Sequence, residues 1–425
     1  MSINAGSSGY TGSRGETWAA DESFDRGHPA STANPIGGTP DPTLYQSERY
    51  GYAFTYTVPV TNGTYQVTLK FAEIFWAKPG QRVFDVTINE QMVLDNFDIL
   101  SQVAPNTALD KTYNVKVTDG SIRVAFTSVK DMAKIAAIQI LPADAVVAPV
   151  IVAAGDIACD PEDRQYNGGS GTAAACRQRA TSDLIRNIGP TAVLALGDNQ
   201  YEDGTLDEYM KSYDPTWGRF KSITYPATGN HEYRTPEAKG YFDYFGSVAG
   251  FADKGYYSVD IGTWHIIALN STCDAVGGCK QGSPQERWLR ADLAAHRSQC
   301  TLAFWHHPLF TSSPYGNDWT SHDLWQALYD AGADVVLNGH AHIYERLGPV
   351  RPDGTADPVK GIREFIVGSG GESHYEFGTI LAASEARTAD TFGILKLTLR
   401  PGGYDWEFVP EAGGAFHDSG SGQCH

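Results

Sequence analysis

Hydrophobic and polar residues alternate along much of the first third of the chain. Apolar side chains at every second position are the pattern of a strand with one buried face. Such runs occupy residues 65–71, 83–88 and 122–126. Turn-forming pairs such as Asn62-Gly63 and Asp119-Gly120 separate them. Many short strands joined by turns are typical of a β-sandwich, so residues 1–142 are predicted to form an all-β domain.

The pattern changes after residue 149, where apolar runs alternate with longer amphipathic segments. The apolar runs predict strands at 150–154, 192–196, 223–227, 264–269, 302–305, 335–337 and 364–367. The amphipathic segments predict helices at 172–187, 284–296 and 321–331, and residues 392–409 predict a hairpin. This alternation indicates a layered α/β domain over residues 150–425. Residues 143–149, which are small and end in proline, are the predicted linker.

Charge and size narrow the range of functions. The chain has 425 residues, which is more than a single hydrophobic core usually supports, so two domains are expected. Its formal net charge is -18. A surface this acidic repels nucleic-acid phosphates, so nucleic-acid binding is not expected as a main function. A small anionic substrate could still be bound where metal ions reverse the local charge.

Cysteine usage bears on the compartment. The six cysteines are even in number and include no CxxC pair, which favours disulfides in an oxidising environment over a zinc site. Cys273 and Cys279 close a short loop and are the first expected pair. Cys159 with Cys176 and Cys300 with Cys424 would complete three bridges. Six buried, reduced thiols are the alternative.

No run of eighteen apolar residues is present, so no membrane span is expected. The N-terminal residues lack the pattern of a signal peptide, which fits either a cytosolic protein or a mature secreted one. Together with the cysteines, this favours an extracellular protein.

Polar clusters directly follow five of the predicted strands. They are residues 155–156, 197–201, 229–232, 306–308 and 339–342. Loops at the carboxyl ends of strands line the functional crevice of α/β sheets, and oxygen and imidazole donors without thiolate suit a first-row metal ion. Taken singly, an aspartate after a strand is commonly a turn former and a lone histidine is commonly a core residue. The joint order of the five clusters favours a metal site.

This order resembles the calcineurin-like metallophosphoesterase superfamily and, within it, the purple acid phosphatases, over about residues 150–410. The motifs are GDIA (155–158), GDNQY (197–201), GNHE (229–232), HHPLF (306–310) and GHAHIYER (339–346), and IVGSGG (366–371) is similar to a later stretch of the family. The resemblance implies a four-layer fold, a β-sandwich flanked by helices, that holds two metal ions.

The family's ligands carry over to seven positions. The resemblance implies that Asp156, Tyr201 and His342 bind the first metal and that Asp198 bridges both metals. It implies that Asn230, His306 and His340 bind the second metal. His306 is chosen over His307 because the family's ligand stands two residues before the proline.

One departure from the wider superfamily indicates which metal is bound. Many members have histidine at the position of Ala158, so the first metal would lose a ligand that Tyr201 can replace. A phenolate suits a strongly Lewis-acidic ion. Fe(III) is therefore expected in the first site, with Fe(II), Zn or Mn in the second. A packed surface aromatic is the alternative for Tyr201.

The resemblance implies hydrolysis of phosphate mono- or diesters by a metal-bridging hydroxide that attacks phosphorus in line. Asp198 and His231 are the expected catalytic residues, with His231 protonating the leaving group or bonding to the phosphate, and Glu232 is expected to orient it. Substrate contacts are expected from Asn230, His231, His307 and Tyr315, the last in a segment, 311–322, expected to roof the pocket. Tyr233 and His374 are further candidates at its rim.

The first domain resembles malectin-like carbohydrate-binding domains. The similar stretches are residues 3–6, 65–99 and 130–140. Matching positions imply sugar contacts from Tyr50, Phe75, Trp76 and Asp131, since aromatic faces suit a pyranose and a carboxylate suits its hydroxyls. A spacer without glycan affinity is the alternative.

The leading hypothesis is a secreted, monomeric phosphoesterase anchored on a glycan by its first domain, with phosphorylated glycans among its candidate substrates. A carbohydrate-binding surface protein with an inactive phosphoesterase scaffold is a second hypothesis. A nucleotide phosphodiesterase on the same metal core is a third.

Overall fold

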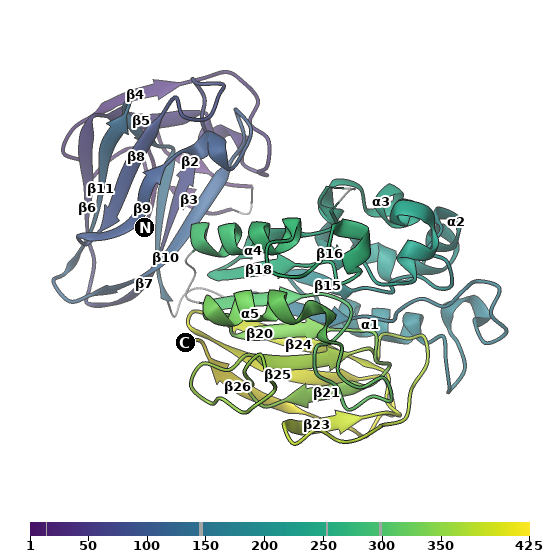
Figure 1. The fold of residues 1–425 in the computed structure, drawn as a ribbon. Helices are drawn as coiled ribbons and strands as arrows, with labels where there is room; N and C mark the ends of the chain where they lie inside the picture. The colour runs from purple at the N-terminus through teal and green to yellow at the C-terminus, as the bar shows by residue number, and fades with distance from the viewer. Residues whose placement is uncertain (14, 144–147, 252–253, 297–299) are drawn as a thin grey trace. The chain divides into compact units, whose positions relative to one another are not determined.

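The chain forms two compact units, Met1–Val147 and Ala148–His425. The computed structural model describes all residues except 14, 144–147, 252–253 and 297–299 (Figure 1). The predicted linker at residues 143–149 lies largely outside the described residues.

The first unit is a β-sandwich. One antiparallel sheet has the order β1 (Ser2–Asn4), β13 (Ala137–Pro142), β7 (Gly63–Phe71), β10 (Leu109–Val117). The other has the order β6 (Ala53–Pro59), β11 (Ser121–Lys130), β8 (Val83–Ile88), β9 (Gln91–Phe97). Smaller sheets are formed by β12 (Ala133–Ile135), β5 (Ser47–Gly51) and β4 (His28–Ser31), and by β2 (Tyr10–Thr11) and β3 (Thr17–Trp18).

The core of this unit follows from the predicted alternation. Along β8 every second side chain is buried, which turns Phe84, Val86 and Ile88 inward. Phe84 and Phe97 pack at a centroid distance of 5.4 Å, and Phe71 packs 5.1 Å from Phe97. The predicted all-β sandwich is therefore confirmed.

The second unit contains two larger sheets. The first has the order β16 (Thr224–Ala227), β15 (Ala192–Leu196), β14 (Val150–Ala154), β24 (Gly393–Arg400), β25 (Gly403–Pro410), β26 (Ser419–Gln423). The second has the order β17 (Tyr257–Ile261), β18 (Trp264–Ala268), β19 (Cys300–Phe304), β20 (Val335–Asn338), β22 (Arg363–Val367), β21 (Tyr344–Leu347), β23 (Ser384–Thr388). Strands β14, β15 and β16 are parallel, as are β18, β19, β20 and β22.

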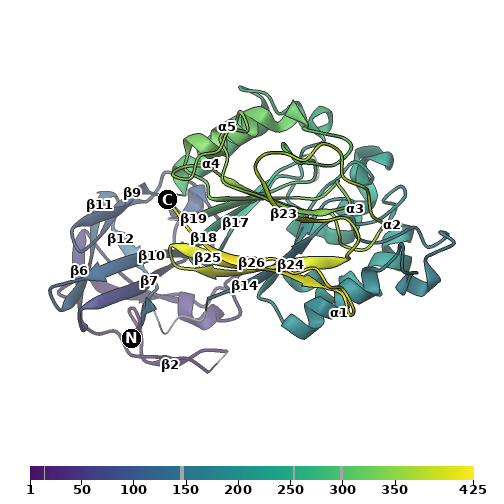
Figure 2. The same ribbon diagram turned by 90° about the horizontal axis from the view of Figure 1, so that it is seen from below.

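Helices cover the outer faces of these sheets. They are α1 (Gln178–Ile188), α2 (Leu206–Glu208), α3 (Lys239–Phe245), α4 (Pro284–Ala295) and α5 (His322–Asp330). Neighbouring side chains of β20 pack on opposite faces of the second sheet. Leu337 packs in a hydrophobic cluster with residues of the first sheet, whereas Val336 packs in a cluster with Leu289 of α4 and Leu324 of α5. Figure 2 shows α1 and the pair α4–α5 on opposite sides of the two sheets. The expected four-layer arrangement is confirmed.

The helix expected at residues 172–187 begins later than predicted. Helix α1 starts only at Gln178, because the preceding residues bond elsewhere. The backbone N–H groups of Cys176 and Arg177 donate to the carbonyls of Glu372 and Gly371 at 2.8 and 2.7 Å. These long-range bonds take the N–H groups of Cys176 and Arg177 away from an earlier helical turn.

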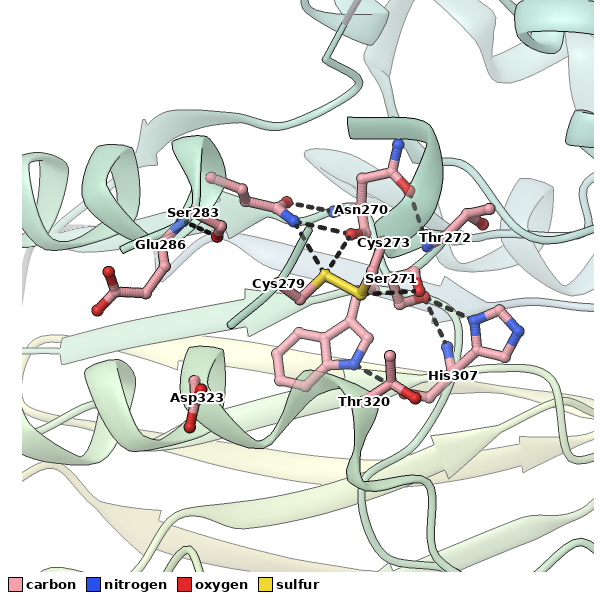
Figure 3. Close-up of a disulfide and its surroundings, with 12 residues drawn as sticks. Asn270, Ser271, Thr272, Cys273, Cys279, Ser283, Glu286, His307, Thr320 and Asp323 are labelled. Atoms are coloured by element: carbon pink, nitrogen blue, oxygen red, sulfur yellow. Dashed lines mark hydrogen bonds between the residues drawn. A yellow bond between two sulfur atoms is a disulfide. The ribbon is translucent and has the colours of Figure 1, made fainter. Parts of the chain in front are cut away.

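All six cysteines are paired as expected. The bridges are Cys159–Cys176, Cys273–Cys279 and Cys300–Cys424. Figure 3 shows the second of these bridges, which closes a loop between β18 and α4. The third joins residues 124 positions apart and fixes the C-terminal segment to β19.

A buried imidazole lies between two carboxylates beside α4. His265 bonds Asp260 through Nδ1 and Asp292 through Nε2, each at 2.8 Å. Burial opposes the charge of this ring, but the two carboxylates outweigh it and raise the pKa of His265 to about 9. The protonated ring therefore ties β17, β18 and α4 together at neutral pH.

Candidate metal centre

The five polar clusters meet at the carboxyl ends of five strands. They follow β14, β15 and β16 in the first sheet and β19 and β20 in the second. Parallel neighbours end at the same edge of a sheet, so their loops converge. These loops carry the predicted ligands Asp156, Asp198, Asn230, His306, His340 and His342.

One group of side chains surrounds the phenol oxygen of Tyr201. This oxygen lies 2.8 Å from Asp156 Oδ1, 3.0 Å from His342 Nε2 and 3.3 Å from Asp198 Oδ2. His342 Nε2 is in turn 3.2 Å from Asp156 Oδ1. The four residues expected at the first metal therefore present their donor atoms to one point.

A second group shares Asp198. His306 Nε2 lies 3.1 Å from Asp198 Oδ2 and 3.3 Å from His340 Nδ1. The side-chain oxygen of Asn230 is buried and has no hydrogen-bond partner among the described residues. A buried acceptor without a partner is costly and calls for a cation or a water molecule. Asp198 Oδ2 belongs to both groups, as a bridging ligand requires.

Outer contacts fix which ring nitrogen faces the site. His306 Nδ1 donates to the Leu196 carbonyl at 3.0 Å, so Nε2 turns inward. His342 Nδ1 lies 3.0 Å from Ser373 Oγ and 3.1 Å from Glu372 Oε2, which orients its Nε2 in the same way. Such outer partners are typical of metal-binding histidines.

The backbone at the ligands is strained. Asp156, Asp198 and His340 have φ values of 58°, 44° and 64°, a region that residues other than glycine rarely adopt. Such conformations cluster at functional sites because the surrounding structure must hold them. Gly229 is required for space, since a Cβ there would lie 2.2 Å from Asp198 Oδ1.

Glu232 holds two of these loops from beneath. Its buried carboxylate accepts hydrogen bonds from the backbone N–H groups of Asp198, Asn199 and Gly229 at 3.0, 2.8 and 2.6 Å. The hydroxyl of Tyr209 adds a bond of 2.9 Å. The structure thus corrects the expectation that Glu232 orients His231, because its oxygens instead anchor the Asp198 and Asn230 loops.

The carboxylates favour positive charge at this site. Burial opposes it, but Asp198 raises the pKa of His306 to about 9 and Asp156 raises that of His342 to about 10. Burial, and then the charge of His306, lower the pKa of His340 to about 4, so the ring is neutral as a ligand must be. Burial and the charges of Asp156 and Asp198 raise the pKa of Tyr201 well above its usual value. The phenol therefore keeps its proton until a cation replaces it. The donor set of carboxylates, imidazoles, an amide and a phenol fits two first-row metal ions.

His231 stands at the rim of this centre. Its Nδ1–H donates to the Glu202 carbonyl at 2.7 Å, which leaves Nε2 as an acceptor. Nε2 is 3.9 Å from Asp198 Oδ2 and 3.2 Å from Arg234 Nη2. The ring therefore borders the centre on the side of the Asn230 loop, where a substrate could reach it.

His307 lies beside the second group, with a ring nitrogen within 4.8 Å of ring nitrogens of His306 and His340. Its Nδ1 is 2.8 Å from Ser271 Oγ, and its ring is 4.4 Å from that of His340. Figure 3 shows Ser271 between His307 and the Cys273–Cys279 bridge. Tyr315, which is exposed, stacks on His340 at 5.2 Å. The segment expected to roof the pocket thus does reach the centre through Tyr315.

The two further rim candidates have structural partners. Tyr233 accepts a hydrogen bond from Asn270 at 2.7 Å. His374 stacks on Phe392 at 3.9 Å, and its Nδ1 lies 3.4 Å from the carbonyl oxygen of His342.

Three of the four residues expected at a sugar site lie together in the first unit. Trp76 Nε1 donates to Asp131 Oδ2 at 2.6 Å, and the Phe75 ring packs edge-on against Trp76 at 4.8 Å. Phe75 is 73% exposed, so its ring is open to solvent beside Trp76. Tyr50 lies on β5, with its ring 5.9 Å from His28, and no contact described here joins it to the other three.

Comparison with known families identifies both units. Residues 150–344 match the calcineurin-like phosphoesterase family, and residues 1–145 match the malectin domain family. The chain thus combines a malectin domain with a phosphoesterase domain, and the two are homologous to malectin and to purple acid phosphatases. The purple acid phosphatase fold implies a site for two metal ions.

Individual relatives match one unit each. Human malectin is 40% identical over 86 residues, which cover 20% of this chain and 30% of malectin. Purple acid phosphatase 15 of Arabidopsis thaliana is 28% identical over 233 residues, covering 45% of this chain and 41% of that protein. The chain thus spans less than half the length of these curated relatives.

A solved purple acid phosphatase from yellow lupin (Lupinus luteus) seeds resembles the whole chain in fold. It superposes with a TM-score of 0.54 at 16% identity, covering 96% of this chain and 76% of that one. At this identity the likeness supports the fold alone.

Several residues of the site were not predicted from the sequence. They are Glu202, Arg234, Ser271, Glu372, Ser373 and Tyr375. Glu372 and Ser373 directly follow the GSGG turn after β22, which was a usable signal. The Tyr375 ring stacks on His342 at 4.0 Å, a contact that no local pattern indicates.

Proposed function

We propose that the second unit is a binuclear phosphoesterase that hydrolyses phosphate esters outside the cell. The observation that carries this proposal is the pair of donor groups that share Asp198 Oδ2. The unpartnered oxygen of Asn230 supports a cation on its side, and the tyrosine at the other group supports a harder ion.

Seven residues would hold the two cations. Asp156, Tyr201 and His342 would bind the first, and Asn230, His306 and His340 the second, with Asp198 between them. Bound there, the cations would activate water and neutralise charge on the phosphoryl group. Fe(III) is proposed at the Tyr201 site, because a strongly Lewis-acidic ion is needed to displace the proton that this buried phenol holds.

The protein's own residues would do the remaining work. His231, with Nε2 as acceptor in this structure, can bond a protonated phosphate oxygen or take a proton that it later donates to the leaving group. Tyr315 and His307 flank the His340 side and would shape the pocket around the rest of the substrate.

The malectin domain would bind a glycan through Phe75, Trp76 and Asp131. Exposed aromatic rings beside a carboxylate suit the apolar face and the hydroxyls of a sugar. Three disulfides fit an oxidising compartment, and no helix among the described residues is long and apolar enough to cross a membrane. A secreted enzyme held on a glycan is the combination we favour.

The test combines metal analysis with two substrates. Purified protein is expected to contain two metal ions per chain and to hydrolyse p-nitrophenyl phosphate, bis-p-nitrophenyl phosphate or both. Tyr201→Phe is expected to lose a visible tyrosinate-to-iron absorption and most of the iron. Inertness toward both esters at full metal content would favour the inactive scaffold, and a colourless active protein would overturn the iron assignment alone.

A further inference from the structure

Arg234 places a positive charge at the mouth of the candidate metal centre. It lies in the 3₁₀ segment Glu232–Arg234, three residues after His231 and four after Asn230. Its Nη2 is 3.2 Å from His231 Nε2, which is itself 3.9 Å from Asp198 Oδ2. The guanidinium is therefore two contacts away from the oxygen that both donor groups share.

The contact between Arg234 and His231 has a defined direction. An arginine nitrogen can only donate, so Arg234 Nη2 donates to His231 Nε2 in this contact, while His231 Nδ1–H donates to the Glu202 carbonyl. Arg234 Nη1 also pairs with the Glu202 carboxylate at 2.7 Å. These two contacts occupy one side of a guanidinium that has five N–H donors, so others remain for a ligand.

The surroundings leave Arg234 accessible to a substrate. Its side chain is 46% exposed and that of Glu202 is 51% exposed, whereas His231 is 12% exposed. The arginine thus lies on the solvent side of His231, where a bound phosphate ester would enter. The chain carries a formal net charge of -18, so a local cation here would oppose the general repulsion of an anionic substrate.

We propose, building on the phosphoesterase function above, that Arg234 is a specificity-determining residue that binds a charged phosphoryl oxygen of the substrate beside His231. A phosphate monoester dianion offers such an oxygen, whereas a diester carries an uncharged ester group in its place. Arg234 therefore sets the relative rates at which this enzyme hydrolyses the two kinds of ester. Guanidinium groups suit this task because their donors match phosphate geometry.

The test is the ratio of kcat/KM for p-nitrophenyl phosphate to that for bis-p-nitrophenyl phosphate. Removing a charge-assisted hydrogen bond in Arg234→Gln is expected to lower the monoester value about 10- to 100-fold and the diester value less than about threefold. Arg234→Lys keeps the charge but not the planar donors, and an intermediate loss is expected.

Binding of inorganic phosphate provides a readout besides turnover. Titration calorimetry of the metal-loaded protein is expected to show about 10-fold weaker phosphate binding in Arg234→Gln, at unchanged metal content. The metal content stays because Arg234 touches no predicted ligand directly. A fall in bound metal would point to a structural effect and would overturn the proposed role.

Glu202→Gln is the matched control for the ion pair. It breaks the same Arg234–Glu202 pair and removes the carboxylate charge 3.6 Å from His231 Nδ1, but it leaves the guanidinium and the Glu202 carbonyl in place. If Arg234 only braces the loop, both variants should lose activity alike. If Arg234 binds substrate, Glu202→Gln should keep or raise monoester turnover.

Two failures are separable. Wild-type protein that hydrolyses neither ester would refute the proposed function as a whole. Active wild-type protein whose Arg234→Gln variant keeps the same ester ratio and phosphate affinity would refute the role of Arg234 alone.

Discussion

Replacing Glu232 by glutamine tests whether a buried carboxylate organises the metal-ligand loops before any ion binds. The change keeps the size of the side chain and removes only its charge and one acceptor. In the structure Oε1 receives the N–H of Asn199 and the Tyr209 hydroxyl, and Oε2 receives the N–H groups of Asp198 and Gly229. The glutamine amide can offer an oxygen to only one of these pairs.

The expected cost follows from the two donors left facing the amide nitrogen. Each buried donor without a partner costs about 1–3 kcal/mol, so the free energy of unfolding should fall by about 2–6 kcal/mol. Burial and the nearby charge of Asp198 raise the pKa of Glu232, so loss of its charge recovers a part of this. Asp198 is a predicted ligand, and Gly229 directly precedes the predicted ligand Asn230. The variant is therefore also expected to retain less metal.

Urea denaturation and metal analysis of the Glu232→Gln variant measure the two effects separately. Tyr209→Phe is the control, since it removes one donor and leaves the carboxylate, and it should cost only about 1 kcal/mol. An unfolding free energy within about 0.5 kcal/mol of wild type, with the same metal per chain, would refute the anchoring role of Glu232.

Three further predictions concern the rest of the fold. Replacing Cys300 and Cys424 by serine opens a loop of 124 residues, and the chain-entropy model expects a loss of about 4–5 kcal/mol in urea denaturation. The pKa of His265 is raised from 6.5 to about 9, so its contribution is full below pH 6.5 and is lost as the pH rises through 9. The stability difference between wild type and His265→Gln should shrink by about 1.4 kcal/mol per pH unit over that window, and a constant difference would contradict it. Trp76→Ala should weaken binding to a panel of oligosaccharides at least about 10-fold, with an unchanged melting temperature.

The sequence predicted where the motif residues emerge, whereas their roles as ligands came from the family resemblance and stay predictions. Asp156, Asp198 and His306 follow strands whose bounds could be read from runs of mostly hydrophobic residues. Parallel order brings the polar ends of neighbouring strands to one edge of a sheet. In the structure the Tyr201 phenol oxygen lies 2.8 Å from Asp156 Oδ1, and His306 Nε2 lies 3.1 Å from Asp198 Oδ2.

The residues that sequence reasoning missed act across long separations. Glu372 meets His342 because β22 and β21 are paired in the second sheet, and no local period encodes that contact. Long-range contacts also explain why α1 begins later than predicted. The N–H groups of Cys176 and Arg177 donate to carbonyls of residues nearly two hundred positions away. Where tertiary hydrogen bonds compete with a local helix signal, the helix starts only after those bonds end.

The site's own geometry indicates how much of it would exist before metal binding. Three predicted ligands have a left-handed backbone conformation. Each such residue destabilises the folded state by about 1–3 kcal/mol, and other interactions in the fold must offset this. Glu232 offsets part of it by binding the turns on which Asp198 and Asn230 stand. A centre held in this way needs no folding step to accept its ions, so metal removal should leave the urea midpoint less changed than Glu232→Gln does. Tyr201, His306 and His342 all have raised pKa values and would each lose a proton on binding a metal ion, so metal uptake should weaken as the pH falls.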